Sequence, residues 1–150
     1  MQFLNKWLSV IHRHGQIFFK DQFEECGLHS GQPIFVVSVC ENPGISQDEL
    51  AELLRMNKST VARTVFQLEQ SGFLRKEINS ADKRIANLYP TKEAKGLYPE
   101  ILRKFEEWNC LLIDGFTKDE EMEFYSMLKR CAHNAIKYAK NGRKEKCQTE

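Results

Sequence analysis

The middle of the chain places hydroxyl, amide and cationic side chains along one face of an expected helix. With the candidate cap that precedes them, these polar residues are Asn57, Lys58, Ser59, Thr60, Arg63 and Gln67. Val61, Val65 and Leu68 recur at spacings of four and three, which predicts that the opposite face packs against a core. Hydroxyls and arginine can bond base edges in the major groove of DNA, whereas a lysine at a helix start suits a phosphate. On its own the stretch fits a plain solvated helix, and the elements before and after it must decide whether it reads DNA.

A second short helix is expected immediately before this one. Ser46 and Glu49 stand three residues apart, which is the spacing of the reciprocal capping box at a helix start. The helix that they open should end near Met56, where the side chain of Asn57 can cap the next helix. Two short helices separated by a turn are thus predicted over residues 46–71.

The residues after this pair change from the helical period towards the period of two that β-strands show. Strands are expected over residues 73–78 and 85–89, joined by a polar turn over 79–83. Lys83 and Arg84 stand at the tip of this hairpin, where cations suit phosphates or a narrow minor groove. Helix, turn, helix and a hairpin with a basic tip is the order of a winged helix-turn-helix.

Long amphipathic helices are expected on both sides of this lobe. Apolar residues recur at helical spacing over about 1–26. Residues 30–41 predict a second helix, although their run of β-branched residues also fits a buried strand. Two further helices are expected over 92–140, and a capping box from Thr117 to Glu120 opens the second of them. The fold class is therefore mainly α, with a small β-hairpin wing.

These segments predict a single domain over 1–140, followed by a polar tail over 141–150 that we expect to be disordered. The winged lobe covers about 30–91, and helical arms over about 1–26 and 92–140 flank it. The apolar stripes of the arms are too extensive for a small lobe to cover, because soluble monomers tolerate only about a few hundred Å² of contiguous apolar surface. We therefore expect an obligate homodimer that is held together by the arms.

The charge of the chain is unevenly distributed, although its net value is only +1. Residues 1–54 carry three cations against seven acids, whereas residues 55–84 carry seven cations against three acids. A basic block between acidic flanks is typical of a local surface that contacts nucleic acid. The charge pattern therefore favours DNA as a partner.

Several classes of function find no support in the sequence. It contains no nucleophile elbow, no Gly-rich phosphate loop and no HExxH spacing, so we expect neither an enzyme nor a cofactor. The five cysteines are irregularly spaced and form no CxxC pair, which favours unpaired thiols in a reducing compartment. No apolar run reaches the roughly 18 residues of a membrane span, and the amino terminus does not read as a signal peptide. We therefore expect a cytoplasmic protein with no membrane partner.

The run from Ile45 to Gly96 resembles the core of the MarR family of bacterial transcriptional regulators. Three features carry the resemblance. They are a leucine-x-x-x-glycine-apolar-apolar step over Leu68–Leu74, an aspartate-x-arginine wing motif over Asp82–Arg84, and a helix-starting Thr91. The long first and last helices resemble the dimerisation arms of the family, so that the resemblance covers nearly the whole chain.

The resemblance implies a homodimer that binds a pseudo-palindromic operator in double-stranded DNA. One helix of each subunit would lie in the major groove, and a wing arginine would reach into the minor groove. Carried over by position, the residues expected to contact DNA are Asn57, Lys58, Ser59, Thr60, Arg63, Gln67, Lys83 and Arg84. Asp82 would pair with Arg84 and orient it. The implied function is repression of transcription, relieved by a small ligand.

The resemblance also suggests where a signal could act. Family members often hold small aromatic ligands where the arms meet the lobe, and the candidate residues here, which could equally be ordinary core residues, are Trp7, Ile11, Phe18, Phe35 and Trp108. Other relatives respond to zinc or to peroxide. The candidate thiol is then Cys26, and the candidate ligands are Glu24, Glu25, Cys26 and His29. We expect no metal site, because a helix end followed by a glycine loop yields such residues by chance.

Two alternative functions remain open at this point. The chain could be a thiol- or metal-responsive regulator of the same fold, or a winged-helix module that binds proteins and has lost DNA binding. The cations of the expected reading helix and hairpin tip argue against the second alternative.

Overall fold

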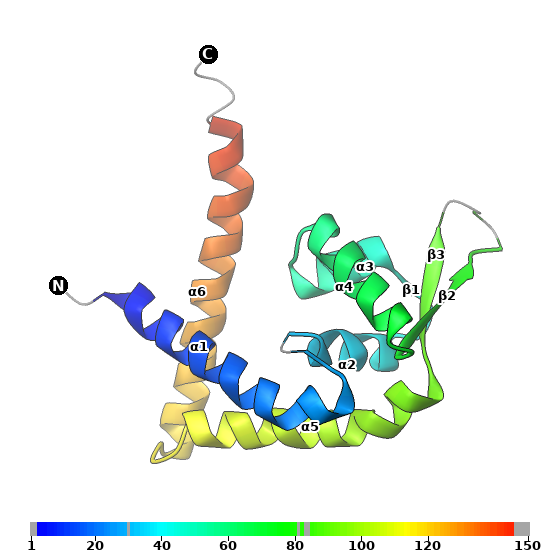
Figure 1. Cartoon of the computed structure of the whole chain (residues 1–150). Coiled ribbons are helices and arrows are strands. Elements are labelled where there is room, and N and C mark those ends of the chain that lie inside the picture. Colours follow the sequence, from blue (N-terminus) through cyan, green and yellow to red (C-terminus); the bar gives the residue numbers. More distant parts are fainter. Residues whose placement is uncertain (1–2, 30, 81, 83–84, 146–150) are drawn as a thin grey trace. The chain divides into compact units, whose positions relative to one another are not determined.

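The computed structural model describes residues 3–29, 31–80, 82 and 85–145, and Figure 1 shows its helices and its small sheet. The chain divides into two compact units, Met1–Trp108 and Asn109–Glu150. The elements in chain order are α1 (Leu4–Phe23), the 3-10 turn η1 (Glu24–Cys26), α2 (Pro33–Glu41), β1 (Ile45–Ser46), α3 (Gln47–Leu54), α4 (Lys58–Gln70), β2 (Leu74–Ile78), β3 (Ala86–Pro90), α5 (Lys92–Leu112) and α6 (Lys118–Glu145). The predicted fold class, mainly α with a hairpin, is confirmed.

Side-chain caps define the starts of two helices where the sequence predicts them. The Ser46 N–H donates to Glu49 Oε2 (2.8 Å), and the Glu49 N–H donates to the Ser46 hydroxyl (3.2 Å), which completes the capping box of α3. The hydrogen bond from the Ser46 backbone lowers the pKa of Glu49. Thr117 and Glu120 make the same two bonds, of 2.8 and 3.3 Å, before α6. Both predicted capping boxes are confirmed.

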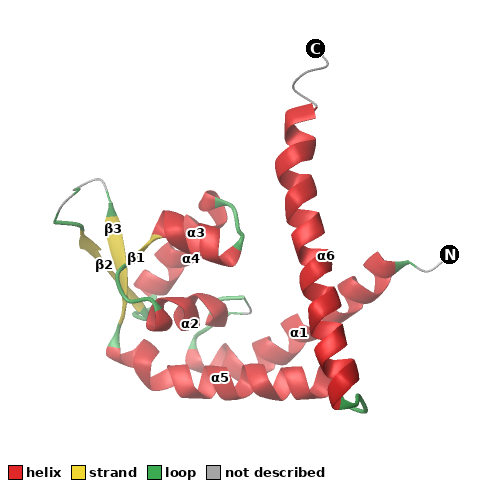
Figure 2. Cartoon of the chain, turned by 180° about the vertical axis from the view of Figure 1, so that it is seen from behind, coloured by secondary structure: helices red, strands yellow, loops and turns green. Residues whose placement is uncertain are grey.

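The segment that fits either a helix or a strand by sequence is the helix α2. It begins at Pro33, later than the start predicted near residue 30, and Gly31 just before it has a φ of +88°. The buried apolar residues of α2 are Phe35, Val36, Val37 and Val39. They do not lie on a single face of the helix, as expected for a helix that packs on more than one element. Figures 1 and 2 both place α2 between the α3–α4 pair and the first part of α5.

The wing contains a third strand that the sequence did not predict. β3 lies at the centre of the sheet and is antiparallel to both β1 and β2. β2 and β3 pair over five residue pairs, which confirms the predicted hairpin within one residue at each end. β1 is only two residues long, too short to show a period of two. Gly44 leads into it with a φ of +91°, a region that favours glycine, and its N–H donates to the Leu88 carbonyl (2.7 Å).

The core of the lobe lies under the inner face of α4. Val61, Val65 and Leu68 are fully buried, as the spacing predicted. They belong to one hydrophobic cluster with Leu50 of α3 and Leu88 of β3. The core therefore fixes which side of α4 faces outward.

In the unit Met1–Trp108, aromatic side chains join α1 to α5. The Phe19 ring packs edge-to-face on Phe105, with ring centroids 5.2 Å apart, and its centroid is 6.1 Å from that of Trp108. A Cβ atom at Gly15 would lie only 3.3 Å from the Trp108 ring, so this glycine allows the close approach. Other apolar side chains of this arm remain 56–65% exposed, and they are Phe3, Leu4, Trp7 and Ile17.

The helix α6 makes up most of the unit Asn109–Glu150. No residue of Lys118–Ala139 is buried, although the helix is amphipathic. Met122 is 65% exposed and Tyr138 is 78% exposed. Among the described residues, no helix combines the length and the apolar character that crossing a bilayer requires.

Candidate nucleic-acid interface

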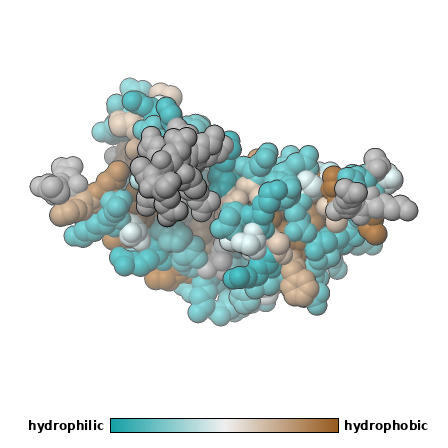
Figure 3. Space-filling view, turned by 90° about the horizontal axis from the view of Figure 1, so that it is seen from above, coloured by the Kyte–Doolittle hydropathy of each residue, from teal (hydrophilic) through white to brown (hydrophobic). Residues whose placement is uncertain are grey.

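The helix α4 presents its polar face on one side of the winged lobe. Figures 1 and 2 place α3, α4 and the hairpin on the side of α2 opposite to α5. Ser59 and Arg63 are exposed on the face of α4 opposite to its buried stripe. Seen from the side of the hairpin tip in Figure 3, the surface of the lobe on the right is mostly hydrophilic. This face can therefore offer hydrogen bonds and positive charge to a partner.

Asn57 organises the start of α4. Its Oδ1 atom accepts a hydrogen bond from the Thr60 N–H (2.9 Å) and another from the Ser59 hydroxyl (2.9 Å). The first bond confirms the predicted cap and satisfies one of the unpaired N–H groups that every helix start leaves. The second orients the Ser59 hydroxyl, whose oxygen remains able to accept a further hydrogen bond.

We expect Asn57→Ala to lower the free energy of unfolding by about 0.5–2 kcal/mol, because alanine cannot cap the helix. Urea unfolding followed by circular dichroism measures this loss. Ser59→Ala is the control, since it removes a hydroxyl that bonds the cap but leaves the Asn57–Thr60 bond in place. Equal destabilisation by both variants would contradict the assigned role of the cap.

The ammonium group of Lys58, the first residue of α4, is engaged within the lobe. Its Nζ atom lies 2.6 Å from Oδ2 of Asp48 on α3, and both side chains are largely exposed. An exposed ion pair of this kind contributes only about 0–1 kcal/mol, so a phosphate can displace the carboxylate. Asp48 then lies beside the phosphate as an unpaired negative charge. The structure thus shows a competitor for the predicted phosphate contact of Lys58.

We expect Asp48→Asn to strengthen DNA binding by roughly two- to fivefold for each lobe, because it frees Lys58 and removes a repelling charge. Fluorescence anisotropy at about 0.1 M salt measures the effect, because salt at this concentration only partly screens charges that lie a few ångströms apart. Asp114→Asn removes an exposed carboxylate from the α5–α6 connection and serves as the matched control. Unchanged affinity for Asp48→Asn would show that the pair does not oppose binding.

Gln67, predicted to contact DNA, has a partner inside the lobe. Its Oε1 atom accepts a hydrogen bond from Nε2 of Gln32 (3.2 Å), and Oε1 of Gln32 accepts one from the His29 N–H (2.9 Å). Gln32 is only 5% exposed, so its amide is a buried link between α4 and the segment that precedes α2. No sequence pattern predicts this link, because Gln32 and Gln67 are 35 positions apart.

An ion pair joins the middle of β2, in the wing, to α4. Nζ of Lys76 on β2 lies 2.6 Å from Oε2 of Glu69 on α4, and both side chains are less than one-third exposed. On the same strand, Arg75 lies 4.8 Å from the centroid of the Tyr89 ring and pairs with Glu77. None of these contacts was anticipated from the sequence.

The tip of the wing is described only in part. The Asp82 N–H donates to Asn79 Oδ1 (3.1 Å), and the Asp82 carbonyl accepts from the Ile85 N–H (3.0 Å), so Asp82 helps to close the hairpin. Lys83 and Arg84 lie outside the described residues, as does the predicted pairing of Asp82 with Arg84.

Comparison with known proteins identifies this architecture. The sequence model of the MarR family matches residues 36–86. The chain is 34% identical over 126 residues to the uncharacterized HTH-type transcriptional regulator YybA of Bacillus subtilis (strain 168), covering 82% of this chain and 84% of that protein. The chain belongs to the MarR family. It is therefore a DNA-binding, winged-helix regulator of transcription, from a family of regulators rather than enzymes.

Solved structures of MarR-family proteins share the fold over almost the entire chain. The transcriptional regulator SlyA superposes with a TM-score of 0.87 at 30% identity, covering 91% of this chain and 96% of SlyA. A putative MarR family transcriptional regulator from Listeria monocytogenes, solved in complex with a 26mer DNA, superposes with a TM-score of 0.86 at 32% identity. That comparison covers 95% of this chain and 97% of the Listeria protein.

Three of the five residues predicted for a ligand pocket in this MarR-family chain come together. Ile11 and Trp108 line a depression of about 290 Å³ between α1 and α5, and the Phe18 ring centroid is 5.3 Å from that of Trp108. Trp7 is 59% exposed and does not line it. Phe35 is 2% exposed in the core of the lobe and does not line it either. For Phe35 the alternative of an ordinary core residue therefore fits better.

The cysteines and acidic residues that the structure describes are not grouped into a metal site, and Cys147 lies outside the described residues. Cys26 is exposed at the end of η1. Burial raises the pKa of the Cys40 thiol, which disfavours its reactive thiolate form. Within the described part of the chain, no three His, Cys, Asp or Glu side chains are placed to hold a metal ion, and this includes the group around Cys26.

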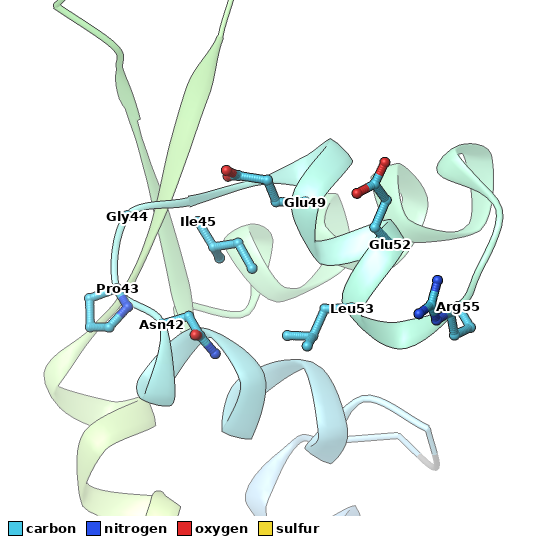
Figure 4. Close-up of a pocket in the computed structure, with 8 residues that line it drawn as sticks. All are labelled: Asn42, Pro43, Gly44, Ile45, Glu49, Glu52, Leu53 and Arg55. Atoms are coloured by element: carbon cyan, nitrogen blue, oxygen red, sulfur yellow. The ribbon is translucent and has the colours of Figure 1, made fainter. Parts of the chain in front are cut away.

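Another depression of the lobe lies beside α3 and has a volume of about 660 Å³. Figure 4 shows that Ile45 and Leu53 point into it, whereas the carboxylates of Glu49 and Glu52 point away from its centre. Polar groups do not converge on one point in it, so we assign no ligand to it.

Proposed function

We propose that this MarR-family regulator is a repressor that binds a pseudo-palindromic operator as a homodimer and is released by a small aromatic ligand. The observation that carries the proposal is the outward face of α4, where Ser59 and Arg63 are exposed on a helix that Asn57 caps. A helix with hydrogen-bonding and cationic side chains fits the major groove, whose base edges present distinct donors and acceptors. The DNA complex of the similar Listeria protein supports this use of the lobe.

Exposed apolar side chains support the homodimer. They include Phe3, just before α1, and Trp7 of α1, which are 65% and 59% exposed, and in α6 they include Met122 and Tyr138, which are 65% and 78% exposed. Soluble monomers rarely leave such stripes uncovered, so a second copy of the chain is the expected cover. A two-fold axis then places the two α4 helices about one turn of DNA apart, on the order of 34 Å, and the operator becomes pseudo-palindromic.

The depression between α1 and α5 supports release by a ligand. Its volume of about 290 Å³ lies at the small end of ligand sites, and aromatic and aliphatic side chains line most of it. A small aromatic molecule that fits one arrangement of the arms better than another shifts the population towards it. Because the arms hold the dimer, such a shift changes the spacing of the two α4 helices and lowers the affinity for the operator.

Selection of bound duplexes from a random pool, followed by affinity measurements at two salt concentrations, tests the proposal. We expect a palindromic consensus, and an affinity that falls steeply with salt because phosphate contacts release counterions. Light scattering at micromolar concentration should give about twice the chain mass of 17.5 kDa. Failure to select any duplex would favour a protein-binding module. A folded monomer that binds a non-palindromic site would refute the dimeric arrangement.

A further inference from the structure

Phe66 is an apolar residue on the outward face of α4 that none of the roles above uses. It follows Ser59 by seven residues, Ala62 by four and Arg63 by three, and residues at these spacings share one side of a helix. All four are exposed, and the exposed fraction of Phe66 is 57%. The buried stripe of Val61, Val65 and Leu68 occupies the opposite side, so Phe66 is no part of the core.

Nothing in the described part of the chain engages the ring of Phe66 through aromatic stacking or a cation–π contact. A single exposed phenylalanine is unremarkable on most surfaces. This one, however, lies among the hydrogen-bonding residues of the face that the proposed function directs into the major groove. With Ala62 four residues earlier, it forms an apolar strip beside Ser59 and Arg63.

The major groove offers such a strip one apolar group, the C5-methyl of thymine. We propose that Phe66 contacts a thymine methyl group in each half of the operator and selects thymine at that position. The inference rests on the proposed binding of DNA through α4. Seven residues of helix span about 10 Å, which corresponds to roughly three base pairs. The selected thymine therefore lies about three base pairs from the base that Ser59 reaches.

Deoxyuridine tests this contact, because it differs from thymidine only by the missing methyl group. Each thymine of the duplex obtained by random selection is replaced in turn, together with its symmetry mate. For the wild-type dimer we expect one symmetric pair at which the replacement weakens binding by roughly fourfold for each half-site, the effect of burying one methyl group. Phe66→Ala should weaken binding to the thymine duplex and lose the sensitivity to uracil at that pair alone.

Two further variants separate this contact from other effects. Ser59→Ala should weaken binding but keep the sensitivity to uracil, whereas Phe66→Leu should keep part of it because leucine remains apolar. If Phe66→Ala is as sensitive to every uracil as the wild type, the inference is wrong although the proposed function stands. It is also wrong if the selected site has no thymine whose methyl matters, or if Phe66→Ala alters the mass in light scattering. Failure of the wild type to select any duplex would overturn both the inference and the proposed function.

Discussion

Replacing Leu68 by alanine is expected to lower the free energy of unfolding by about 2–5 kcal/mol. Leu68 is fully buried in the cluster that holds α4 against α3 and β3. The substitution removes its apolar contacts and leaves a cavity that the packed neighbours fill only in part. Because natural domains are stable by only about 5–15 kcal/mol, this loss is a large fraction of the total. Urea unfolding, followed by circular dichroism at constant protein concentration, measures it.

Phe66→Ala is the matched control for this experiment. It also replaces a large apolar residue of α4, but one that is 57% exposed on the opposite side of the helix. We expect its effect to be about 0.5 kcal/mol or less, as for most surface substitutions. Comparable losses for the two variants would mean that the inner and outer faces of α4 are wrongly assigned.

Arg63→Ala is expected to weaken operator binding by about 1–3 kcal/mol for each half-site. Arg63 is exposed on the outward face of α4 and forms no ion pair with any described residue, so its guanidinium is free to bond a base. A bidentate contact to guanine is the commonest specific use of arginine in the major groove. Fluorescence anisotropy with the selected duplex and with a scrambled duplex measures the loss, which should be larger on the selected duplex.

Arg103→Ala provides the comparison for this prediction. Arg103 lies on α5, where it pairs with Glu100 and Glu107, and its loss removes the same formal charge from the chain. We expect little change in DNA affinity from it. Equal losses for Arg63→Ala and Arg103→Ala would indicate that overall charge, rather than a contact made by α4, governs binding.

The sequence predicted the parts of the lobe that depend on neighbouring residues. The spacing of Val61, Val65 and Leu68 fixed the inner face of α4, and the cap at Asn57 and the box at Ser46 fixed two helix starts. Such signals are local, because a helix start needs only a side-chain oxygen near the N–H groups of the next turn. The hairpin was also predicted, from the change of period and its polar turn.

The contacts that modify the interface could not be predicted, because they join residues that are distant along the chain. Gln67 looked like a DNA contact from its place on the polar face, yet the buried amide of Gln32 engages its oxygen. Lys58 was expected to contact a phosphate, yet it pairs with Asp48 across the turn between two helices. Both partners are identified only by the way in which α2 and α3 pack on α4. A role for Phe66 is not predictable from the sequence for another reason, since a single apolar residue on a polar helix face forms no recurring pattern.

The ion pair between Lys76 and Glu69 has a consequence for how a signal could reach DNA. Because it joins the middle of β2 to α4, we expect the wing and the helix of each lobe to move together. The proposed ligand would then change the conformation within each lobe only a little. In the proposed dimer, such a ligand can alter the distance between the two lobes. If that distance no longer matches the pitch of the double helix, only one lobe can bind its half-site. Regulation would therefore act on the spacing of two winged lobes whose own structure does not change.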